Sequence, residues 1–295
     1  MEKSLLKEVI RNYYLLTKFH VNVVVALTSV LGYLLGAGYY DIAVELEKVT
    51  GLFFGGILVT ATAHIINQLL ERQYDAMMLR TRNRPLVTGD VGAGQAVGAA
   101  LLFSLSGLAW LYVAVHPYAA FISFVSLVMY AFIYTPVKRL SRIAVPLGAV
   151  PGALPVLIGY VGATGRVDTV VILLFVLQVI WQFPHFWSVA WIWQKSYEAA
   201  GYDLMPSPGG KTKRNAFLTF LSTFGLYPVI YLLYDGQYID LTLFLLLAVL
   251  TLIFSVQAFV LFLRRTDISA KRLLKASVIY LPVVQLLIVY HFINR

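Results

Sequence analysis

The sequence contains no cysteine and few charged residues. Without cysteine the chain has no disulfide, no thiolate metal ligand and no thiol nucleophile, so oxygen or imidazole must hold any bound metal. A hard ion such as Mg²⁺ is the metal expected first. Asp, Glu, Lys and Arg make up only 13% of the 295 residues, compared with about 25% in an average soluble domain. This scarcity excludes an ordinary soluble globular protein.

Apolar residues are abundant and lie in long runs. They form 60% of the chain, in about nine runs of roughly 17 to 25 residues, each long enough to cross a bilayer as a helix. The runs cover about residues 21–38, 50–70, 94–115, 118–135, 144–161, 169–193, 215–234, 240–263 and 274–292. Stretches such as 241–249 do not alternate between apolar and polar residues, which argues against a β-barrel. We predict an all-α polytopic membrane protein, a single domain over residues 1–295 with about nine transmembrane helices in one bundle.

The distribution of basic residues between the loops predicts the orientation. If the N-terminus is cytoplasmic, that side carries 20 of the 23 Lys and Arg residues, and only Lys48, Arg166 and Arg295 lie on the other side. Positive charge is retained in the cytoplasm, so we expect a cytoplasmic N-terminus. The net charge of +9 therefore reflects orientation, and no nucleic-acid partner is expected. The first apolar run is too long for a signal peptide and should remain as a membrane span.

The first of two long cytoplasmic loops follows the second apolar run and covers residues 71–93. Around its start, Asn67, Glu71 and Asp75 are spaced i, i+4 and i+8, which would place an amide and two carboxylates on one face of a helix. Such oxygen ligands suit Mg²⁺, which leaves further positions for substrate phosphates. Arg80 and Arg84 can present planar guanidinium groups to the same phosphate oxygens. The pattern predicts diphosphate binding.

The alternative for this segment is a helix end that carries solvated charge, with Glu71 or Asp75 paired to nearby arginines. His64 and Asn67 favour the functional interpretation. Both lie in the last turns of an apolar span, where a polar side chain must face protein or a water-filled cavity.

The second long loop covers residues 194–214 and follows a span with an embedded polar stripe. Gln178, Gln182 and His185 are spaced i, i+4 and i+7, and Pro184 should interrupt the helix beside them. Hydrogen bonds between helices are the alternative, and for Gln178 the favoured one. Most aromatic residues here, Trp181 among them, suit an interfacial belt. The loop adds a second cluster of oxygen ligands, which could face the first and clamp one diphosphate through metal: Ser196, Tyr197, Glu198 and Asp203.

Three separated motifs carry a family resemblance. They are NQLLERQYD at 67–75 with MLRTRNRPL at 78–86, then YTPVKR at 134–139, and finally WQFPHF at 181–186 with YEAAG at 197–201. In this order they resemble the UbiA superfamily of intramembrane prenyltransferases, and within it the members that farnesylate heme. The chain departs from the family pattern with Glu71 in place of a frequent Asp, Ser196 in place of Asp, Ala144 in place of Asn, and Phe19-His20 in place of Pro-Arg. Glu198 or Asp203 would have to replace the missing acid.

The resemblance implies an activity and a set of site residues. It implies transfer of a farnesyl group from farnesyl diphosphate to a vinyl group of protoheme IX (heme b), which gives heme O for heme-copper oxidases. Mg²⁺ would bind Asn67, Glu71 and Asp75, with Glu198 and Asp203 as further ligands. The cations implied to neutralise the leaving diphosphate are Arg80, Arg84, Lys138 and Arg139, and the residues implied to contact heme are His185, Trp181, Tyr197 and His64.

The resemblance also implies a setting and partners. The expected location is the inner membrane of a bacterium, with the active-site loops on the cytoplasmic side and both substrates reached from the lipid bilayer. Heme A synthase and oxidase assembly proteins are the candidate protein partners. Two alternatives remain: a related prenyltransferase that acts on a quinone or chlorophyll precursor, and a secondary transporter, which would instead show inverted repeats and polar groups near the bilayer midplane.

Overall fold

The structure is a computed structural model that describes residues 2–295, and side chains from residue 6 onward. All regular structure in this range is helical. Nine helices within it are long and apolar enough to cross a membrane. They are α2 (Phe19–Tyr39), α3 (Leu46–Met77), α5 (Ala93–Ala114), the Pro117–Val137 span, α8 (Ala144–Thr164), α9 (Thr169–Ile192), the Lys213–Asp235 span, α13 (Leu241–Arg264) and α14 (Asp267–Ile293). The predicted fold class, a helical bundle with about nine spans, is confirmed.

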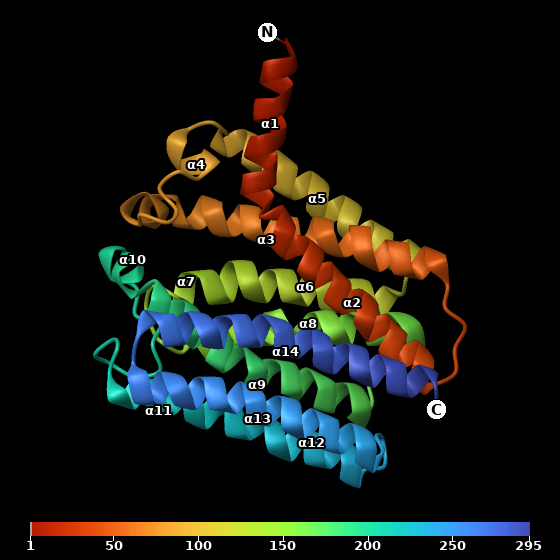
Figure 1. The fold of residues 1–295 in the computed structure, drawn as a ribbon. Coiled ribbons are helices and arrows are strands. Elements are labelled where there is room, and N and C mark those ends of the chain that lie inside the picture. The colour runs from red at the N-terminus through yellow and green to blue at the C-terminus, as the bar shows by residue number, and fades with distance from the viewer. Residues whose placement is uncertain (1) are drawn as a thin grey trace.

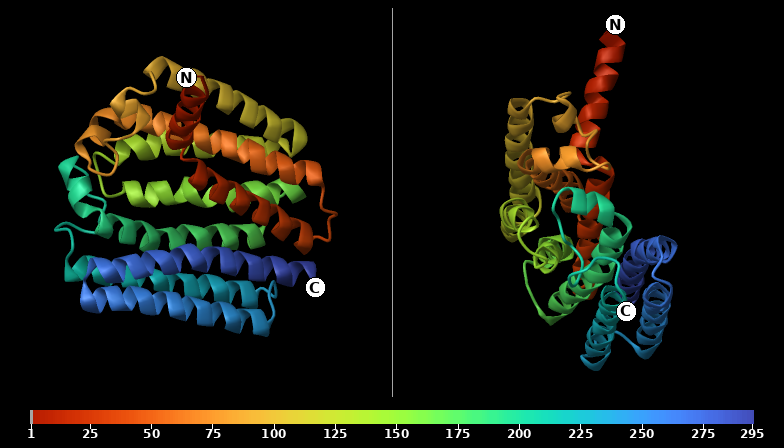
Figure 2. Two further views of the ribbon diagram at one scale, coloured as in Figure 1. Left: turned by 45° about the horizontal axis from the view of Figure 1, so that its top comes forward. Right: turned by 90° about the vertical axis from the view of Figure 1, so that its left-hand side faces the viewer.

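The spans lie side by side, and their irregular connections gather at one end of the bundle (Figure 1). The short helices α4 (Pro85–Thr88) and α10 (Gln194–Ala199) both lie at this end. One further helix, α1 (Glu2–Thr17), precedes the first span, and it projects beyond the other helices when the molecule is viewed from that end (Figure 2, right). The two long loops of the sequence are therefore neighbours in space.

Two spans change helical type along their length. One consists of α6 (Pro117–Val128), a π-helical turn η1 (Met129–Tyr134) and α7 (Thr135–Val137). The other consists of α11 (Lys213–Ser222), a 3₁₀ turn η2 (Thr223–Gly225) and α12 (Leu226–Asp235). A π-helical turn is uncommon and occurs frequently at functional sites. Here it brings the rings of Tyr130 and Tyr134 to 5.2 Å between centroids.

Several helix boundaries differ from those expected. Helix α3 continues to Met77 rather than ending near residue 70, because hydrogen bonds and ion pairs from other elements satisfy its polar last turns. This extension shortens the first long loop. Helix α9 runs unbroken through Pro184, so the predicted interruption was wrong. Proline removes a single N–H donor, and neighbouring groups in a packed membrane helix can satisfy the carbonyl that loses its partner.

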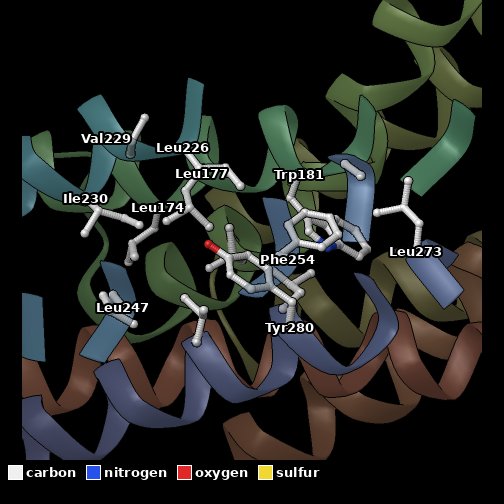
Figure 3. Packing of buried hydrophobic residues seen from close by; sticks show 14 of the residues in the cluster. Leu174, Leu177, Trp181, Leu226, Val229, Ile230, Leu247, Phe254, Leu273 and Tyr280 are labelled. Atoms are coloured by element: carbon white, nitrogen blue, oxygen red, sulfur yellow. The ribbon is translucent and has the colours of Figure 1, made fainter. Parts of the chain in front are cut away.

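The main hydrophobic core fixes the position of α9 (Figure 3). Trp181 on α9 lies beside Tyr280 on α14 and Phe254 on α13 in this view. The rings of Phe254 and Tyr280 stack with centroids 4.9 Å apart. The Tyr280 hydroxyl also shares a 2.8 Å hydrogen bond with Thr251. Trp181 of α9 thus packs beside two further helices, α13 and α14.

Helices α2 and α8 approach each other through glycine. A Cβ atom on Gly159 would collide with the backbone of Ser29, and one on Gly32 would collide with the backbone of Val156. Small residues at membrane helix contacts allow such close backbone approach, and packing rather than the hydrophobic effect holds the helices together. These two glycines therefore define how deeply α2 enters the bundle.

We expect Gly159→Val to destabilise the fold by about 3 kcal/mol, because the new side chain must push α2 away from α8. Chemical unfolding in detergent, followed by circular dichroism, measures this change. Gly98→Ala is the matched control, since a Cβ atom at Gly98 meets nothing within 4 Å. Equal stability of the Gly159→Val protein and the control would contradict the close contact.

Candidate active site

The last turns of α3 carry a buried polar face. Asn67, Glu71 and Asp75 lie on it, and their exposed fractions are only 2%, 1% and 1%. The Asn67 amide donates hydrogen bonds to Glu71 Oε2 at 3.0 Å and to Thr135 Oγ1 at 3.1 Å. The structure thus brings the amide and both carboxylates onto one inward side of a single helix.

Glu71 is the meeting point of three segments. Lys138, directly after α7, donates to Glu71 Oε2 at 2.7 Å. The hydroxyl of Tyr202, from the second long loop, donates to Glu71 Oε1 at 3.3 Å. Burial lowers the pKa of Lys138, while the adjacent Glu71 carboxylate opposes this change. The pair therefore holds a positive and a negative charge together where little water reaches either.

Asp75 forms the second buried ion pair. Arg84 donates to Asp75 Oδ2 at 2.5 Å, and their side chains are 15% and 1% exposed. The hydroxyl of Thr81 donates to the backbone carbonyl of Asp75 at 2.9 Å, which folds the loop back toward the helix. The other carboxylate oxygen, Oδ1, is buried without a hydrogen-bond partner among the described residues. Asp75 thus keeps one free acceptor.

The two remaining predicted cations contact aromatic rings. The guanidinium of Arg80 lies 5.7 Å from the ring centroid of Tyr197 and 5.9 Å from that of Trp193. Arg139 lies over Tyr74 at 4.5 Å and donates to the carbonyl of Leu70. Among the described residues, the ion pairs of Glu71 and Asp75 are made by Lys138 and Arg84, and Arg139 makes neither.

The second acidic cluster does not join the first. Glu198 is exposed and accepts a 2.6 Å hydrogen bond from Gln194, while Asp203 is exposed and forms an ion pair with Arg142. Within residues 2–295, no group of three His, Asp or Glu side chains is arranged to hold a metal. Glu198 and Asp203 instead line a cavity of about 150 Å³ with Tyr197 and Tyr202. Tyr202 connects this cavity to Glu71.

His185 and Trp181 form a stacked pair on α9, with ring centroids 4.8 Å apart. His185 Nδ1 shares a 2.8 Å hydrogen bond with Ser277 Oγ, and Trp181 Nε1 donates to the carbonyl of Ser277 at 2.9 Å. Nearby, Gln178 donates to the carbonyl of Gly152 at 3.3 Å, which agrees with its expected role between helices. Ser277 thus leaves the second ring nitrogen of His185 as the one that could meet a ligand.

His64 lies on α3 and is 7% exposed. Both of its ring nitrogens are buried without a hydrogen-bond partner in the described chain. Its ring meets that of Tyr130 edge to face, with centroids 5.6 Å apart.

Sequence reasoning missed several residues that surround the acidic face. Thr135 and Tyr202 contact it directly. Lys18, between α1 and α2, has a left-handed backbone with φ of 53° and is half-buried. Burial, followed by the charges of Arg84, Lys138 and Arg80, lowers the pKa of Lys18 to about 7. The one signal for Lys18 in the sequence was its position directly before Phe19-His20, where the chain departs from the family pattern.

Comparison with known proteins identifies the family. The profile of the UbiA prenyltransferase family matches residues 25–279. The chain belongs to this family. A protoheme IX farnesyltransferase from Cytophaga hutchinsonii is 36% identical over 274 residues, which cover 93% of this chain and 95% of that protein. Another protoheme IX farnesyltransferase, from Flavobacterium psychrophilum, is 31% identical over 284 residues, which cover 95% and 94% of the two chains.

A solved structure shares the fold. A UbiA homolog from Archaeoglobus fulgidus bound to GPP and Mg²⁺ superposes with a TM-score of 0.66 at 15% sequence identity, covering 96% of this chain and 100% of that one. The family match and the relatives at 31–36% identity show that the present chain is a prenyltransferase, and its nine apolar helices within residues 2–295 make it a multi-pass membrane protein. The transporter alternative is thereby excluded.

Lys18 should make the stability of this UbiA protein depend on pH. Its pKa is about 7 in the folded chain and 10.5 in an unperturbed lysine, so the unfolded chain binds more protons between these values. The contribution of Lys18 to the free energy of unfolding should therefore rise from about pH 7 to pH 10.5. Unfolding measurements in detergent should show that Lys18→Met removes this rise. The exposed Lys195 provides the control, Lys195→Met, and an unchanged pH profile in Lys18→Met would contradict the shift.

Proposed function

We propose that this protein transfers a farnesyl group from farnesyl diphosphate to a vinyl group of protoheme IX, which gives heme O. The buried face of Asn67, Glu71 and Asp75, paired with Lys138 and Arg84, is the observation that carries the proposal. The choice of substrates is supported by the relative named protoheme IX farnesyltransferase at 36% identity across nearly the whole chain.

The donor set of this face fits a magnesium ion. Two carboxylates and an amide oxygen match the hard oxygen ligands that Mg²⁺ prefers, and Asp75 Oδ1 is a buried acceptor with no hydrogen bond among the described residues. We expect Asn67, Glu71 and Asp75 to hold the ion. When bound, Mg²⁺ would neutralise charge on the diphosphate oxygens.

The cations of the site suit the leaving group. Lys138 and Arg84 now contact the carboxylates, and both can turn to diphosphate oxygens as negative charge arrives. Arg80 lies against Tyr197 and Trp193 with its guanidinium available at the same end of the bundle. Fixed cations in a site with little water stabilise charge that develops on the departing oxygens. Breakage of the C–O bond would leave an allylic farnesyl cation for attack by the heme vinyl group.

We expect protoheme IX, the acceptor of the farnesyl group, to bind beside α9. His185 and Trp181 present a stacked pair inside the membrane, and the hydrogen bond between Ser277 and Nδ1 restrains the angle of the His185 ring. A flat macrocycle with a central iron suits such a surface, because imidazole is a common axial ligand of heme iron. Tyr197, which the resemblance implies as a heme contact, lies against Arg80. The porphyrin and the apolar prenyl tail would both arrive from the lipid.

The orientation and the cellular setting belong to the same proposal. The loop end holds most basic residues, so we place it in the cytoplasm of a bacterial cell, with the protein in the inner membrane. The whole chain would act as one intramembrane domain. Heme A synthase and oxidase assembly proteins are the partners that a source of heme O would serve.

The proposed reaction can be tested directly with the purified protein. Incubation with heme b, farnesyl diphosphate and Mg²⁺, followed by mass spectrometry of the extracted heme, should reveal heme O. EDTA should stop the reaction, and added Mg²⁺ should restore it. Transfer to a quinone precursor with no change in heme would instead favour another acceptor within the family. Restoration by Zn²⁺ alone would argue against the oxygen ligand set.

Asp75→Asn should lower turnover by about a hundredfold or more, because it removes one charge from the polar face while it preserves shape. The fold should survive, since the amide can still accept from Arg84. The heme assay measures turnover, and circular dichroism checks folding. Asp90→Asn is the control, because Asp90 is exposed at the same end of the bundle. Turnover of Asp75→Asn equal to that of the control would remove Asp75 from the site.

His185→Ala should weaken heme binding or shift the heme absorbance spectrum, and it should leave Mg²⁺-dependent binding of farnesyl diphosphate nearly intact. The variant removes the imidazole but keeps Ser277 and the surrounding core. Spectroscopic titration with heme and equilibrium binding of farnesyl diphosphate measure the two effects. His291→Ala, on the opposite end of α14, serves as the control. An equal loss of heme binding and of farnesyl diphosphate binding would indicate that His185 makes a structural hydrogen bond. No change in either binding would exclude His185 from the site.

A further inference from the structure

The proposed reaction, on which the following inference rests, consumes a water molecule. The farnesyl C1 carbon bonds to the terminal vinyl carbon as its bond to diphosphate breaks. A positive charge then remains on the vinyl carbon next to the pyrrole ring. The hydroxyl group of heme O requires that water oxygen bond to this carbon and that one proton depart. A membrane-embedded enzyme must therefore hold a water molecule and provide a base.

Four residues of the described chain have every side-chain polar atom buried without a partner, and two of them, Asn22 on α2 and His64 on α3, have two such atoms each. The other two, Trp191 and Ser255, have one each. Asn22 is 0% exposed and His64 is 7% exposed. Buried polar groups in native proteins are nearly always hydrogen-bonded to protein or to ordered water. Four such atoms on two neighbouring helices, Asn22 and His64 contributing two each, therefore indicate a partner other than the side chains and backbone of the described residues.

The two residues lie at similar depth in the membrane. Gln68 Nε2 on α3 donates to the carbonyl of Leu16 just before α2, and Gly56 faces Ala26 further along the same pair of helices. These two contacts bracket Asn22 on one helix and His64 on the other. Asn22 and His64 thus occupy the same stretch of the α2–α3 contact.

His64 also lies on the reactive side of α3. It precedes Glu71 by seven residues, which is two helical turns, so both point from the same face. The rise along the helix between them is about 10 Å. The ring of Tyr130, which contacts His64, also contacts Tyr134 of the π-helical turn, and Tyr134 lies 5.6 Å from the Lys138 ammonium. A continuous series of rings thus links His64 to the acidic face.

We propose that His64 is a catalytic base that holds the water molecule added to the farnesylated vinyl group, with Asn22 as a positioning residue for that water. A neutral imidazole offers one donor and one acceptor nitrogen, and it can take a proton during attack. The water oxygen bonds to the cationic carbon, and one proton of that water moves to the free nitrogen of His64. The proton then leaves with the released diphosphate, so that farnesyl diphosphate, heme and water give heme O and protonated diphosphate.

The role of His64 can be tested by the product that forms from the cation on the farnesylated vinyl group. If no water is delivered, the cation loses a proton and forms an alkene, so the product is lighter than heme O by one water. Purified wild type, His64→Leu and His64→Gln are incubated with heme b, farnesyl diphosphate and Mg²⁺ in isotopically labelled water. Mass spectrometry then gives the ratio of the dehydrated product to labelled heme O.

We expect His64→Leu to raise this ratio about tenfold or more. His64→Gln, which can bind water but cannot take its proton, should give an intermediate ratio, and Asn22→Leu a smaller rise than His64→Leu. The heme absorbance spectrum should remain that of wild type in each variant. His291→Leu is the control, because His291 lies at the opposite end of the bundle and should keep the wild-type ratio.

Three results would overturn the role of His64. One is a wild-type ratio in both His64 variants. Another is a His64→Gln protein that makes heme O at the wild-type rate while His64→Leu makes no farnesylated heme, because this would indicate a structural hydrogen bond. The last is a shifted heme spectrum in His64→Leu, because this would identify an iron ligand. A wild-type protein that farnesylates no heme at all would instead refute the proposed function.

Discussion

Two ion pairs inside the membrane end of α3 organise the rest of this protein. Glu71 and Asp75 are almost without solvent, and a carboxylate in such a place that loses its partner destabilises a fold by about 3–5 kcal/mol. Their partners come from separate segments, Lys138 after α7 and Arg84 from the loop after α3. These two ion pairs thus hold the loop after α3 and the α6–η1–α7 span against the carboxylates on one face of α3.

The buried ion pairs of Glu71 and Asp75 can exchange partners, which an apolar contact cannot do. An apolar contact that opens loses its packing, whereas an ion pair can exchange its partner for another charge of the same sign. Lys138 also lies over the rings of Tyr134 and Tyr202 at 5.6 Å and 5.1 Å. These rings can retain the ammonium group while its anionic partner changes. The face can therefore exchange internal carboxylate–cation contacts for metal–carboxylate and cation–phosphate contacts without repacking of the bundle.

The sequence predicted the fold and the polar face of α3 because both depend on local periodicity. Apolar run lengths locate the spans, and four-residue spacing places Asn67, Glu71 and Asp75 on one side of a helix. Residues from other elements were not predictable this way. Thr135, Tyr202 and Lys18 reach the face through the packing of distant segments, and no spacing relates them to Glu71. For the same reason the sequence placed Glu198 and Asp203 in a facing cluster, whereas the structure directs them to Gln194 and Arg142.

The glycine contact between α2 and α8 has a consequence for how apolar substrates move. Where backbones meet without intervening side chains, no rotamer change can open a gap, so this seam stays closed to a lipid tail. Spans that touch through flexible side chains can separate locally at much smaller energetic expense. A prenyl chain that leaves the bilayer must therefore enter between other helices than α2 and α8.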